Sequence, residues 1–568
     1  MALLLGACAP LPRQVERPAS HALASPQGTP LAGLTDQLRP KSATARDSGF
    51  LLLAGPQEAY GARLALIHAA QKTLDLQYYA IHVDASTGRL IRAVRAAAER
   101  GVRVRILLDD FHSAGRDALI MRLAFEQNIE VRMFNPVPGN RNSMLTRMFG
   151  ALTDPSLLQQ RMHNKLFVAD NAMGVTGGRN LGDAYFGNSE DANFVDVDVL
   201  AAGPIVAAMS RSFDDYWNDE RAYPAQSLIS LKELEKIRTQ AREEREKARQ
   251  PDTAHNGEEM PSSPGDTRTA HADDEAARAR QRRRAWDEQP TDLPAMRLTW
   301  APAAVLADPP EKIGGEAPSG SLTTHTPHAP SAPPRPAPDP ATPIDDVGVV
   351  ESLLQLLSRA RESVFIISPY FVPGQDMLDA LADTRRRGVR VQLLTNSLAS
   401  NDAVAAHAGY IRHRRALLAM GVELFELRSE GGTGGGAFGS GGTGSGGTGS
   451  SGTGSGGASR SMLHSKLITL DGRWVVIGSM NLDLRSQLQN TELALLIRSA
   501  DLARAVDGRF DGTVRRAAWH LQSDERGQLV WRAPEGSGLP DARTEPDTTA
   551  GQRLLMHLLS PLAPQRLL

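Results

Sequence analysis

Residues 161–186 read RMHNKLFVADNAMGVTGGRNLGDAYF, and residues 461–486 read SMLHSKLITLDGRWVVIGSMNLDLRS. Both segments fit the pattern HxKxxxxDxxxxxxGzxN, where z is Gly or Ser, without a gap. A single HxK is uninformative, because it occurs by chance in many proteins. Two complete copies in one chain indicate an internal duplication, and this duplication decides the fold.

The sequence before the first copy predicts alternating helices and strands. Residues 60–73 (YGARLALIHAAQKT) have apolar residues at helical spacing, and residues 74–81 (LDLQYYAI) form a β-prone run. Residues 88–110 then predict a helix that ends at Gly101, followed by a buried strand over 102–108.

The sequence before the second copy repeats this order. Residues 350–373 and 377–397 give a helix, a strand, a second helix and a second strand, and the junction Gly-Val-Arg-Val of residues 101–104 returns at 388–391. We therefore expect an α/β protein of two duplicated α/β halves, with mixed sheets packed about a pseudo-two-fold axis.

Composition divides the rest of the chain. With 51 Gly and 36 Pro but only 5% aromatic residues, much of the 568-residue chain is predicted to be linker. The expected divisions are a signal or lipobox segment with a disordered tether (1–48), the first half (49–225), a charged and Pro-rich linker with an ordered strand near 296–300 (226–345), the second half with a disordered Gly-rich loop at 431–459 (346–535), and a C-terminal tail (536–568).

Charge and cysteine content exclude several classes of protein. The 63 basic and 65 acidic residues nearly cancel, which disfavours a nucleic-acid partner and requires any anion site to be local. The single cysteine excludes intramolecular disulfides and Cys-based zinc clusters. No apolar run approaches the roughly 18–20 residues that a membrane-spanning helix needs.

The single cysteine also bears on localisation. Cys8 follows Leu5-Gly6-Ala7, which resembles the lipobox at which bacterial lipoproteins are cleaved and lipidated. This interpretation predicts a membrane-associated bacterial protein, anchored through Cys8 and facing the periplasm, whose true start lies upstream of Met1. The alternative is a chance LGAC, which would allow the cytoplasmic membrane surface.

The motif predicts where its side chains point. In a strand, residues i and i+2 share a face, so His163 projects with Lys165, and His464 with Lys466. If the halves pack about a pseudo-two-fold axis, both pairs meet in one cleft that suits a phosphodiester. One neutral histidine can attack phosphorus and leave a phosphohistidine, while the other, protonated, gives a proton to the leaving alkoxide.

The remaining motif positions are expected to support this cleft. Asp170 and Asp471 fall at predicted hairpin turns, so they are expected to be turn residues or supports rather than proton carriers. Small residues allow close approach of a ligand, and amides donate hydrogen bonds. Phosphate contact is therefore expected at Gly178, Asn180, Ser479 and Asn481, with a turn role as the alternative for the two asparagines.

These motifs resemble those of a known family. Over residues 54–531, apart from the linkers, the chain resembles the phospholipase D superfamily, and ISPYFVP, HAGY and NTEL resemble the bacterial cardiolipin synthases of the C type. The resemblance implies His163 as nucleophile and His464 as acid and base, with no metal and no cofactor. It also implies that an acidic residue after each motif orients a histidine, and Asp196 and Glu492 fit these positions.

The implied reaction is phosphatidyl transfer at a membrane surface. Phosphatidylglycerol gives its phosphatidyl group to the headgroup of a second phospholipid, and phosphatidylethanolamine can take part as donor or acceptor. Three alternatives stay open: a phospholipase D that uses water and releases phosphatidic acid, a nuclease of the same superfamily, and a noncatalytic lipid-binding lipoprotein. The near-neutral charge disfavours the nuclease, and two intact motifs disfavour the noncatalytic protein.

Four further segments have two interpretations each. His407 and Tyr410 either line the substrate cleft or are structural. The run Arg385–Arg387 is a solvated helix end or a contact for lipid headgroups. The apolar segments 144–152 and 554–568 either touch a bilayer surface or pack on the core.

Overall fold

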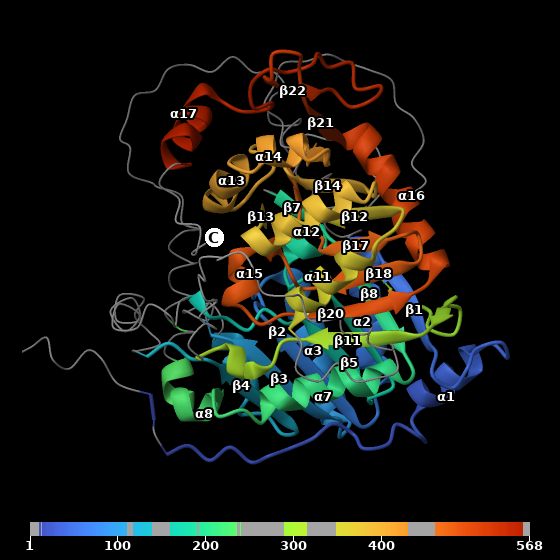
Figure 1. The fold of residues 1–568 in the computed structure, drawn as a ribbon. Helices are drawn as coiled ribbons and strands as arrows, with labels where there is room; N and C mark the ends of the chain where they lie inside the picture. The colour runs from blue at the N-terminus through green and yellow to red at the C-terminus, as the bar shows by residue number, and fades with distance from the viewer. Residues whose placement is uncertain are drawn as a thin grey trace, which may run out of the picture.

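Figure 1 shows a computed structural model of the protein, with the first half in blue to green below the second half in yellow to red. It describes residues 11–12, 14–110, 118–138, 159–189, 192–235, 239, 289–314, 348–429 and 460–560. The predictions for Cys8, for the apolar segment 144–152 and for the Gly-rich loop 431–459 lie outside the described residues.

The first half is built around a nine-stranded mixed sheet. Its strands are β1 (Ser48–Leu53), β2 (Thr73–Tyr78), β3 (Arg103–Asp109), β4 (Ile129–Phe134), β5 (Leu166–Ala169), β6 (Met173–Gly177), β8 (Asp198–Ala202), β9 (Ala222–Pro224) and β10 (Thr299–Ala301). Their order is β10-β1-β8-β6-β5-β2-β3-β4-β9, with β2, β3 and β4 parallel and the other neighbours antiparallel. The helices are α2 (Pro56–Ala69), α3 (Ala85–Glu99), α4 (Ala118–Leu123), α7 (Ile205–Trp217) and α8 (Ala225–Leu228).

The second half repeats this sheet. Its strands are β11 (Ala303–Ala307), β12 (Ser363–Ile367), β14 (Arg390–Asn396), β15 (Glu423–Leu427), β17 (Leu467–Leu470), β18 (Trp474–Gly478), β20 (Leu493–Arg498), β21 (Ala518–Ser523) and β22 (Leu529–Arg532). Their order is β11-β20-β18-β17-β12-β14-β15-β21-β22, with β12, β14 and β15 parallel. The helices are α11 (Val349–Arg359), α12 (Gln375–Arg386), α13 (Val404–Ile411), α14 (Arg414–Ala419), α15 (Leu484–Leu488), α16 (Ala500–Ala517) and α17 (Ala550–Leu559).

The repeated Gly-Val-Arg-Val junction has the same structure in both halves. Gly101 follows α3 with φ of +93°, and Gly388 follows α12 with φ of +85°. This left-handed conformation favours glycine and lets each helix end directly before a parallel strand. The predicted α/β duplication with mixed sheets is therefore confirmed.

One buried apolar cluster joins the two halves. It contains Phe213 and Trp217 of α7, Phe510 of α16, and strand residues from both sheets. Two short strands, β7 (Ala192–Val195) and β16 (Arg460–Leu463), also pair in parallel across the halves.

A second contact across the halves mirrors the β7–β16 pair. Met162, just before the first motif histidine, bridges Thr491 of the second half. Each half therefore pairs with the segment that leads to the other half's motif histidine, which is the reciprocity expected of a pseudo-two-fold arrangement.

The prediction of a disordered tether over 1–48 is wrong for its described part. Residues Pro30–Leu38 form helix α1, and an extended segment around residues 18–20 packs on the first half. The buried side chains of Arg132 and Arg105 donate to backbone carbonyls of that segment at 2.6 and 2.8 Å. Buried guanidinium groups need acceptors, and this segment supplies them although its composition is typical of disorder.

The linker and the tail also contain ordered elements. The strand expected near 296–300 is found as β10, which lies at one edge of the first sheet, and β11 directly after it lies at an edge of the second sheet. The tail contains α17. Among the helices of the described ranges, none combines the length and the apolar content needed to cross a bilayer.

Candidate active site

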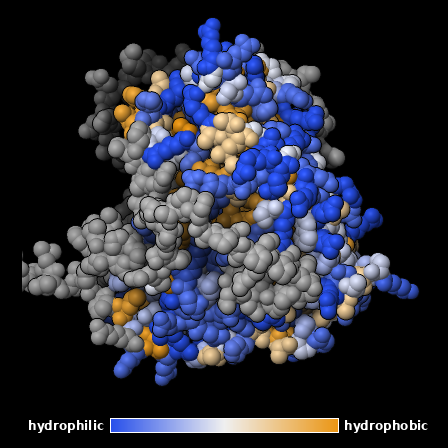
Figure 2. Space-filling view, viewed as in Figure 1, coloured by the Kyte–Doolittle hydropathy of each residue, from blue (hydrophilic) through white to orange (hydrophobic). Residues whose placement is uncertain are grey.

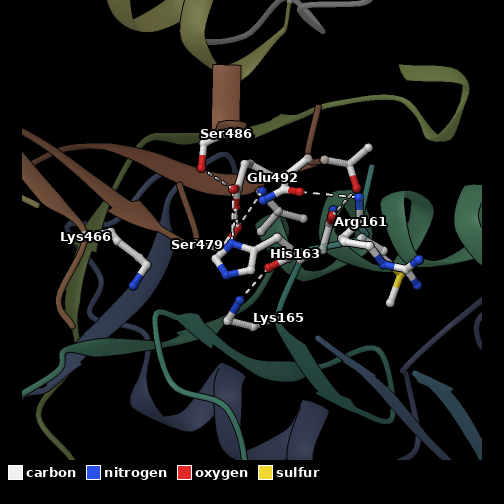
Figure 3. A network of polar contacts seen from close by, with 12 residues as sticks. Arg161, His163, Lys165, Lys466, Ser479, Ser486 and Glu492 are labelled. Carbon is white, nitrogen blue, oxygen red and sulfur yellow. Dashed lines mark hydrogen bonds and ion pairs between the residues drawn. The ribbon is translucent and has the colours of Figure 1, made fainter. Parts of the chain in front are cut away.

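His163 lies just before β5, and its imidazole is held by Glu492. The Nδ1 atom lies 2.9 Å from Glu492 Oε2 and 3.0 Å from Oε1. Glu492 in turn accepts hydrogen bonds from Ser479 Oγ at 2.5 Å and from Ser486 Oγ at 2.8 Å (Figure 3). Because the Glu492 carboxylate contacts Nδ1, the ring nitrogen that remains available to react with a substrate is Nε2.

His464 lies before β17 and is held in the same way by Asp196. Its Nδ1 lies 2.7 Å from Asp196 Oδ2. A Cβ at residue 178 would overlap the Asp196 carboxylate, so Gly178 leaves the room that this carboxylate occupies. The rings of Tyr185 and Phe194 pack beside the imidazole, with centroids at 5.3 and 4.9 Å.

Each carboxylate therefore contacts the histidine of the opposite half. His163 and Glu492 are 329 positions apart in the chain, and His464 and Asp196 are 268 positions apart. The family resemblance implied that an acidic residue after each motif orients a histidine, but it did not show that each carboxylate contacts the histidine of the other half.

Lys165 and Lys466 complete the site. Each Nζ donates to the carbonyl of its own motif histidine at 2.6 Å. Burial lowers the pKa of Lys165 to about 7 against the opposing effect of Glu492, and burial also lowers the pKa of Lys466 against the opposing effect of Asp196. The reciprocal contacts Glu492–His163 and Asp196–His464 bring both His-Lys pairs to the boundary between the halves, so these groups line one site. Within it, Lys466 and both carboxylates affect the pKa of Lys165.

The two imidazoles differ in their electrostatic environment. Burial lowers the pKa of His163 well below its usual value, and Lys165, Lys466 and His464 lower it further. Burial and Lys466 also lower the pKa of His464, but less far, because the Asp196 carboxylate acts in the opposite direction. His163 is thus held neutral, and His464 is the more readily protonated ring of the same site.

The motif aspartates lie at the far ends of the β5–β6 and β17–β18 hairpins. Asp170 and Asp471 have φ of +52° and +51°, in turns. Asp170 accepts the backbone N–H groups of residues 71–73 at 2.7–3.2 Å, and Asp471 accepts those of residues 361–363 at 2.7–3.1 Å. They tie each hairpin to the start of the neighbouring strand, as turn residues rather than proton carriers.

The amide positions of the two motifs differ from each other. Asn180 Oδ1 accepts from the backbone N–H of Ala80 at 3.2 Å, and its Nδ2 donates to the Tyr185 hydroxyl at 3.0 Å. Asn481 is buried, and its Oδ1 has no hydrogen-bond partner among the described residues. Asn180 therefore supports the aromatic wall beside His464, whereas Asn481 keeps an unused polar atom.

The sequence analysis missed the side chains that fix the backbone in front of each histidine. Asp109, at the end of β3, pairs with Arg161 at 2.8 Å and accepts the Met162 N–H at 2.9 Å. Asn396, at the same place in β14, accepts the Leu463 N–H at 2.9 Å. The available signal was that both repeated strands end in a polar side chain that can accept a hydrogen bond.

The other candidates lie elsewhere. Tyr410 is buried and donates to Glu426 at 3.0 Å, and buried His407 contacts Arg414 at 3.3 Å, so both belong to a structural network. The run Arg385–Arg387 lies at the partly exposed C-terminal end of α12. Within the described ranges, no group of three or more His, Cys, Asp or Glu side chains is arranged to hold a metal ion.

Comparison with known proteins identifies the family. Residues 64–217 and 353–514, one segment in each half, match the family model described as "Cardiolipin synthase, PLD-like domain". The chain belongs to the phospholipase D superfamily, in the cardiolipin synthase family.

Individual relatives agree with this assignment. The chain is 34% identical over 518 residues to cardiolipin synthase C of Escherichia coli (strain K12), covering 90% of this chain and 94% of the relative. It is 22% identical over 460 residues to cardiolipin synthase A of Edwardsiella ictaluri (strain 93-146), covering 78% and 65%. The fold matches a crystal structure of phosphatidylserine synthase from Haemophilus influenzae Rd KW20 with a TM-score of 0.55 at 14% identity, covering 91% and 95%. The protein is thus a phospholipase D-family enzyme of the cardiolipin synthase type.

Proposed function

We propose that the protein is a metal-independent phosphatidyltransferase that forms cardiolipin from phosphatidylglycerol and a second phospholipid. The observation that supports this is the reciprocal pair of contacts Glu492–His163 and Asp196–His464, which sets two imidazoles in one site with two buried lysines. One such site can hold a single phosphodiester between a nucleophile and an acid. The similarity to cardiolipin synthases supplies the substrate class.

In the first step, His163 is the nucleophile. Its Nε2 attacks the phosphorus of phosphatidylglycerol while Glu492 holds Nδ1. The bond between phosphorus and the headgroup oxygen breaks, and His464 gives its proton to that oxygen, so glycerol leaves. The lowered pKa of His163 keeps its ring unprotonated and nucleophilic, and Asp196 favours the protonated form of His464 that this step needs.

In the second step, the acceptor replaces His163 on phosphorus. A headgroup hydroxyl of a second phosphatidylglycerol gives its proton to His464 and attacks phosphorus, and the bond from phosphorus to His163 breaks. The product is cardiolipin, and both histidines return to their starting states. Phosphatidylethanolamine as donor would release ethanolamine in the first step, and water as acceptor would give phosphatidic acid.

The lysines and the remaining motif residues serve the phosphate. The charges of Lys165 and Lys466 stabilise the nonbridging oxygens as negative charge builds up on them in the transition state. In this proposal the Nδ2 group of Asn481 adds a hydrogen bond to the phosphate, whereas Gly178, Asn180 and Ser479 act through the carboxylates and the tyrosine beside the histidines.

A product assay tests this function. Purified protein is incubated with phosphatidylglycerol vesicles, with and without phosphatidylethanolamine, in the presence of a chelator, and the lipids are identified by mass spectrometry. We expect cardiolipin. Phosphatidic acid alone would favour the hydrolase, and cleavage of DNA or of a simple phosphodiester without any change in the lipids would contradict both lipid functions.

The place of action is a second part of the proposal. We propose that the protein is lipid-anchored through Cys8 and faces the periplasm, because Leu5-Gly6-Ala7-Cys8 resembles a lipobox. Mass spectrometry of the mature N-terminus is expected to show an acylated cysteine. An unmodified residue upstream of Cys8 would contradict the anchor and favour the cytoplasmic surface.

A further inference from the structure

Helix α17 has one face packed on the second half. It begins after Thr549, whose side chain accepts the Gln552 N–H while the Gln552 side chain accepts the Thr549 N–H. Met556 is buried in a small cluster with Leu398 and Ala408 of the α13 region. Just past the helix, Ser560 Oγ donates to the Ala408 carbonyl at 3.1 Å. The helix is thus fixed in place on α13.

The opposite face of α17 carries leucines that point away from the protein. Leu554, Leu555 and Leu558 are 61%, 48% and 58% exposed. At 3.6 residues per turn they share one stripe, opposite buried Met556. In Figure 2 apolar atoms appear at the upper left, where Figure 1 places α17. Exposing three large leucines to water on one short helix is unfavourable unless something covers them.

The charged residues of α17 indicate which kind of partner covers these leucines. Residues 550–559 include Arg553 and His557 but no Asp or Glu. The two acidic residues that precede the helix are each paired with an arginine, Glu545 with Arg414 and Asp547 with Arg428. An apolar stripe beside basic residues is typical of helices that lie in the headgroup region of anionic membranes. An anionic bilayer therefore fits this face in both hydrophobicity and charge.

Helix α17 is connected to the active site through a series of packed elements. Its support, α13, starts just after Asp402, whose carboxylate accepts the Tyr370 hydroxyl at 2.7 Å. Beside α13, the strand at Phe371–Val372 pairs with Leu482–Asp483, which directly follows Asn481 of the second motif, so these contacts lead to the site. In Figure 1, α17, α13, β13 (Phe371–Val372) and α15 follow one another along the left side of the molecule, with contacts from α17 to α13 and from α13 to β13.

We propose that the leucine face of α17 docks on an anionic phospholipid bilayer and holds the enzyme at the surface that contains its lipid substrates. This docking rests on the proposed function, because both substrates then lie in the membrane that the helix touches. The helix is a positioning element, since its leucines contact neither the histidines nor the lysines.

Vesicle binding tests the docking without turnover. The full-length chain carries C8S, which removes any acyl anchor, and is sedimented with sucrose-loaded vesicles of phosphatidylglycerol and phosphatidylcholine. We expect L554S/L558S to lower the partition coefficient by about ten- to hundredfold. The matched control L231S/L539S replaces two leucines that are 41% and 37% exposed elsewhere, and it is expected to bind like the parent.

A second measurement does not depend on how the serine variants fold. C8S removes the only cysteine, so L554C carries a single environment-sensitive fluorophore, with L539C as its control. We expect a blue shift on anionic vesicles for L554C alone. Activity of L554S/L558S on short-chain phosphatidylglycerol below its micelle concentration should equal that of the parent.

Three results would overturn the docking surface. They are unchanged vesicle binding by L554S/L558S, no spectral shift for L554C, or loss of a dimer in light scattering with vesicle binding intact, which would make the face a subunit contact. A protein that binds vesicles through α17 but forms no cardiolipin would contradict the proposed function alone, so the two failures are distinguishable.

Discussion

In the first half, the backbone in front of His163 is fixed by a buried ion pair, whereas in the second half the backbone in front of His464 is fixed by an uncharged amide. Asp109, paired with Arg161, accepts the preceding N–H at 2.9 Å, and Asn396 accepts the equivalent N–H at the same distance. The two halves therefore reach one backbone geometry with different charges, so the geometry, rather than the charge, is what the site requires of these positions.

The two carboxylates that contact the histidines also differ, in the direction of their pKa shifts. Glu492 is buried and accepts from two serine hydroxyls, and burial raises its pKa. Asp196 is buried too, but the His464 charge lowers its pKa. The Asp196 pair is thus the one better suited to hold a proton on its histidine. A symmetric fold thereby provides unequal partners, one neutral nucleophile and one proton donor.

The largest expected effect comes from removing each histidine in turn. H163A should abolish the covalent adduct and lower cardiolipin formation by about 10⁴-fold or more, because no nucleophile remains. H464A should slow the formation and resolution of the adduct by about 10²–10⁴-fold, since only proton transfer is lost. Rapid quenching into neutral sodium dodecyl sulfate with radiolabelled phosphatidylglycerol measures both, because the phosphohistidine bond is stable at neutral pH but not in acid. H68A, at an exposed histidine of α2, is the control, and an adduct on His464 would reverse the two roles.

A smaller, pH-dependent effect separates the two carboxylates. Asp196 raises the pKa of His464, so D196N should let His464 lose its proton at lower pH and move the descending limb of kcat/KM to lower pH. E492Q should lower kcat without moving that limb, because Glu492 holds the nucleophile. The pH profiles of both variants and the parent check this. A shift of the descending limb by E492Q instead would assign the acid role to His163.

Local sequence patterns were sufficient for the repeated units and the turns. The helix and strand periodicities, the glycine after α3 and α12, and the hairpin positions of Asp170 and Asp471 depend on neighbours within a few residues. The structure reproduces them because their causes are local. The family resemblance likewise depends on the spacing within two short motifs.

Contacts between distant segments could not be read from such patterns. Which carboxylate meets which histidine depends on how the halves pack, across 329 and 268 positions of chain. The segment around residues 18–20 has a disordered composition but is ordered by buried arginines of the first sheet. Asn180 was expected to contact the phosphate, but its amide donates a hydrogen bond to the Tyr185 hydroxyl. This contact forms only when the strand ends are brought together.

The last expected effect is on stability. It tests the two contacts that fix the backbone before each histidine: the Asp109–Arg161 pair, which holds the Met162 N–H, and Asn396, which holds the Leu463 N–H. R161A leaves the buried Asp109 carboxylate without its cation, which should cost about 3–5 kcal/mol, whereas N396A leaves unpaired backbone groups and should cost about 1–3 kcal/mol. D109N/R161M replaces the ion pair with an uncharged amide, as in the second half. It should recover most of the lost stability, because an amide can still accept the Met162 N–H. Thermal unfolding midpoints rank the three variants. If D109N/R161M is as unstable as R161A, the charge itself, and not the backbone contact, holds the first motif in place.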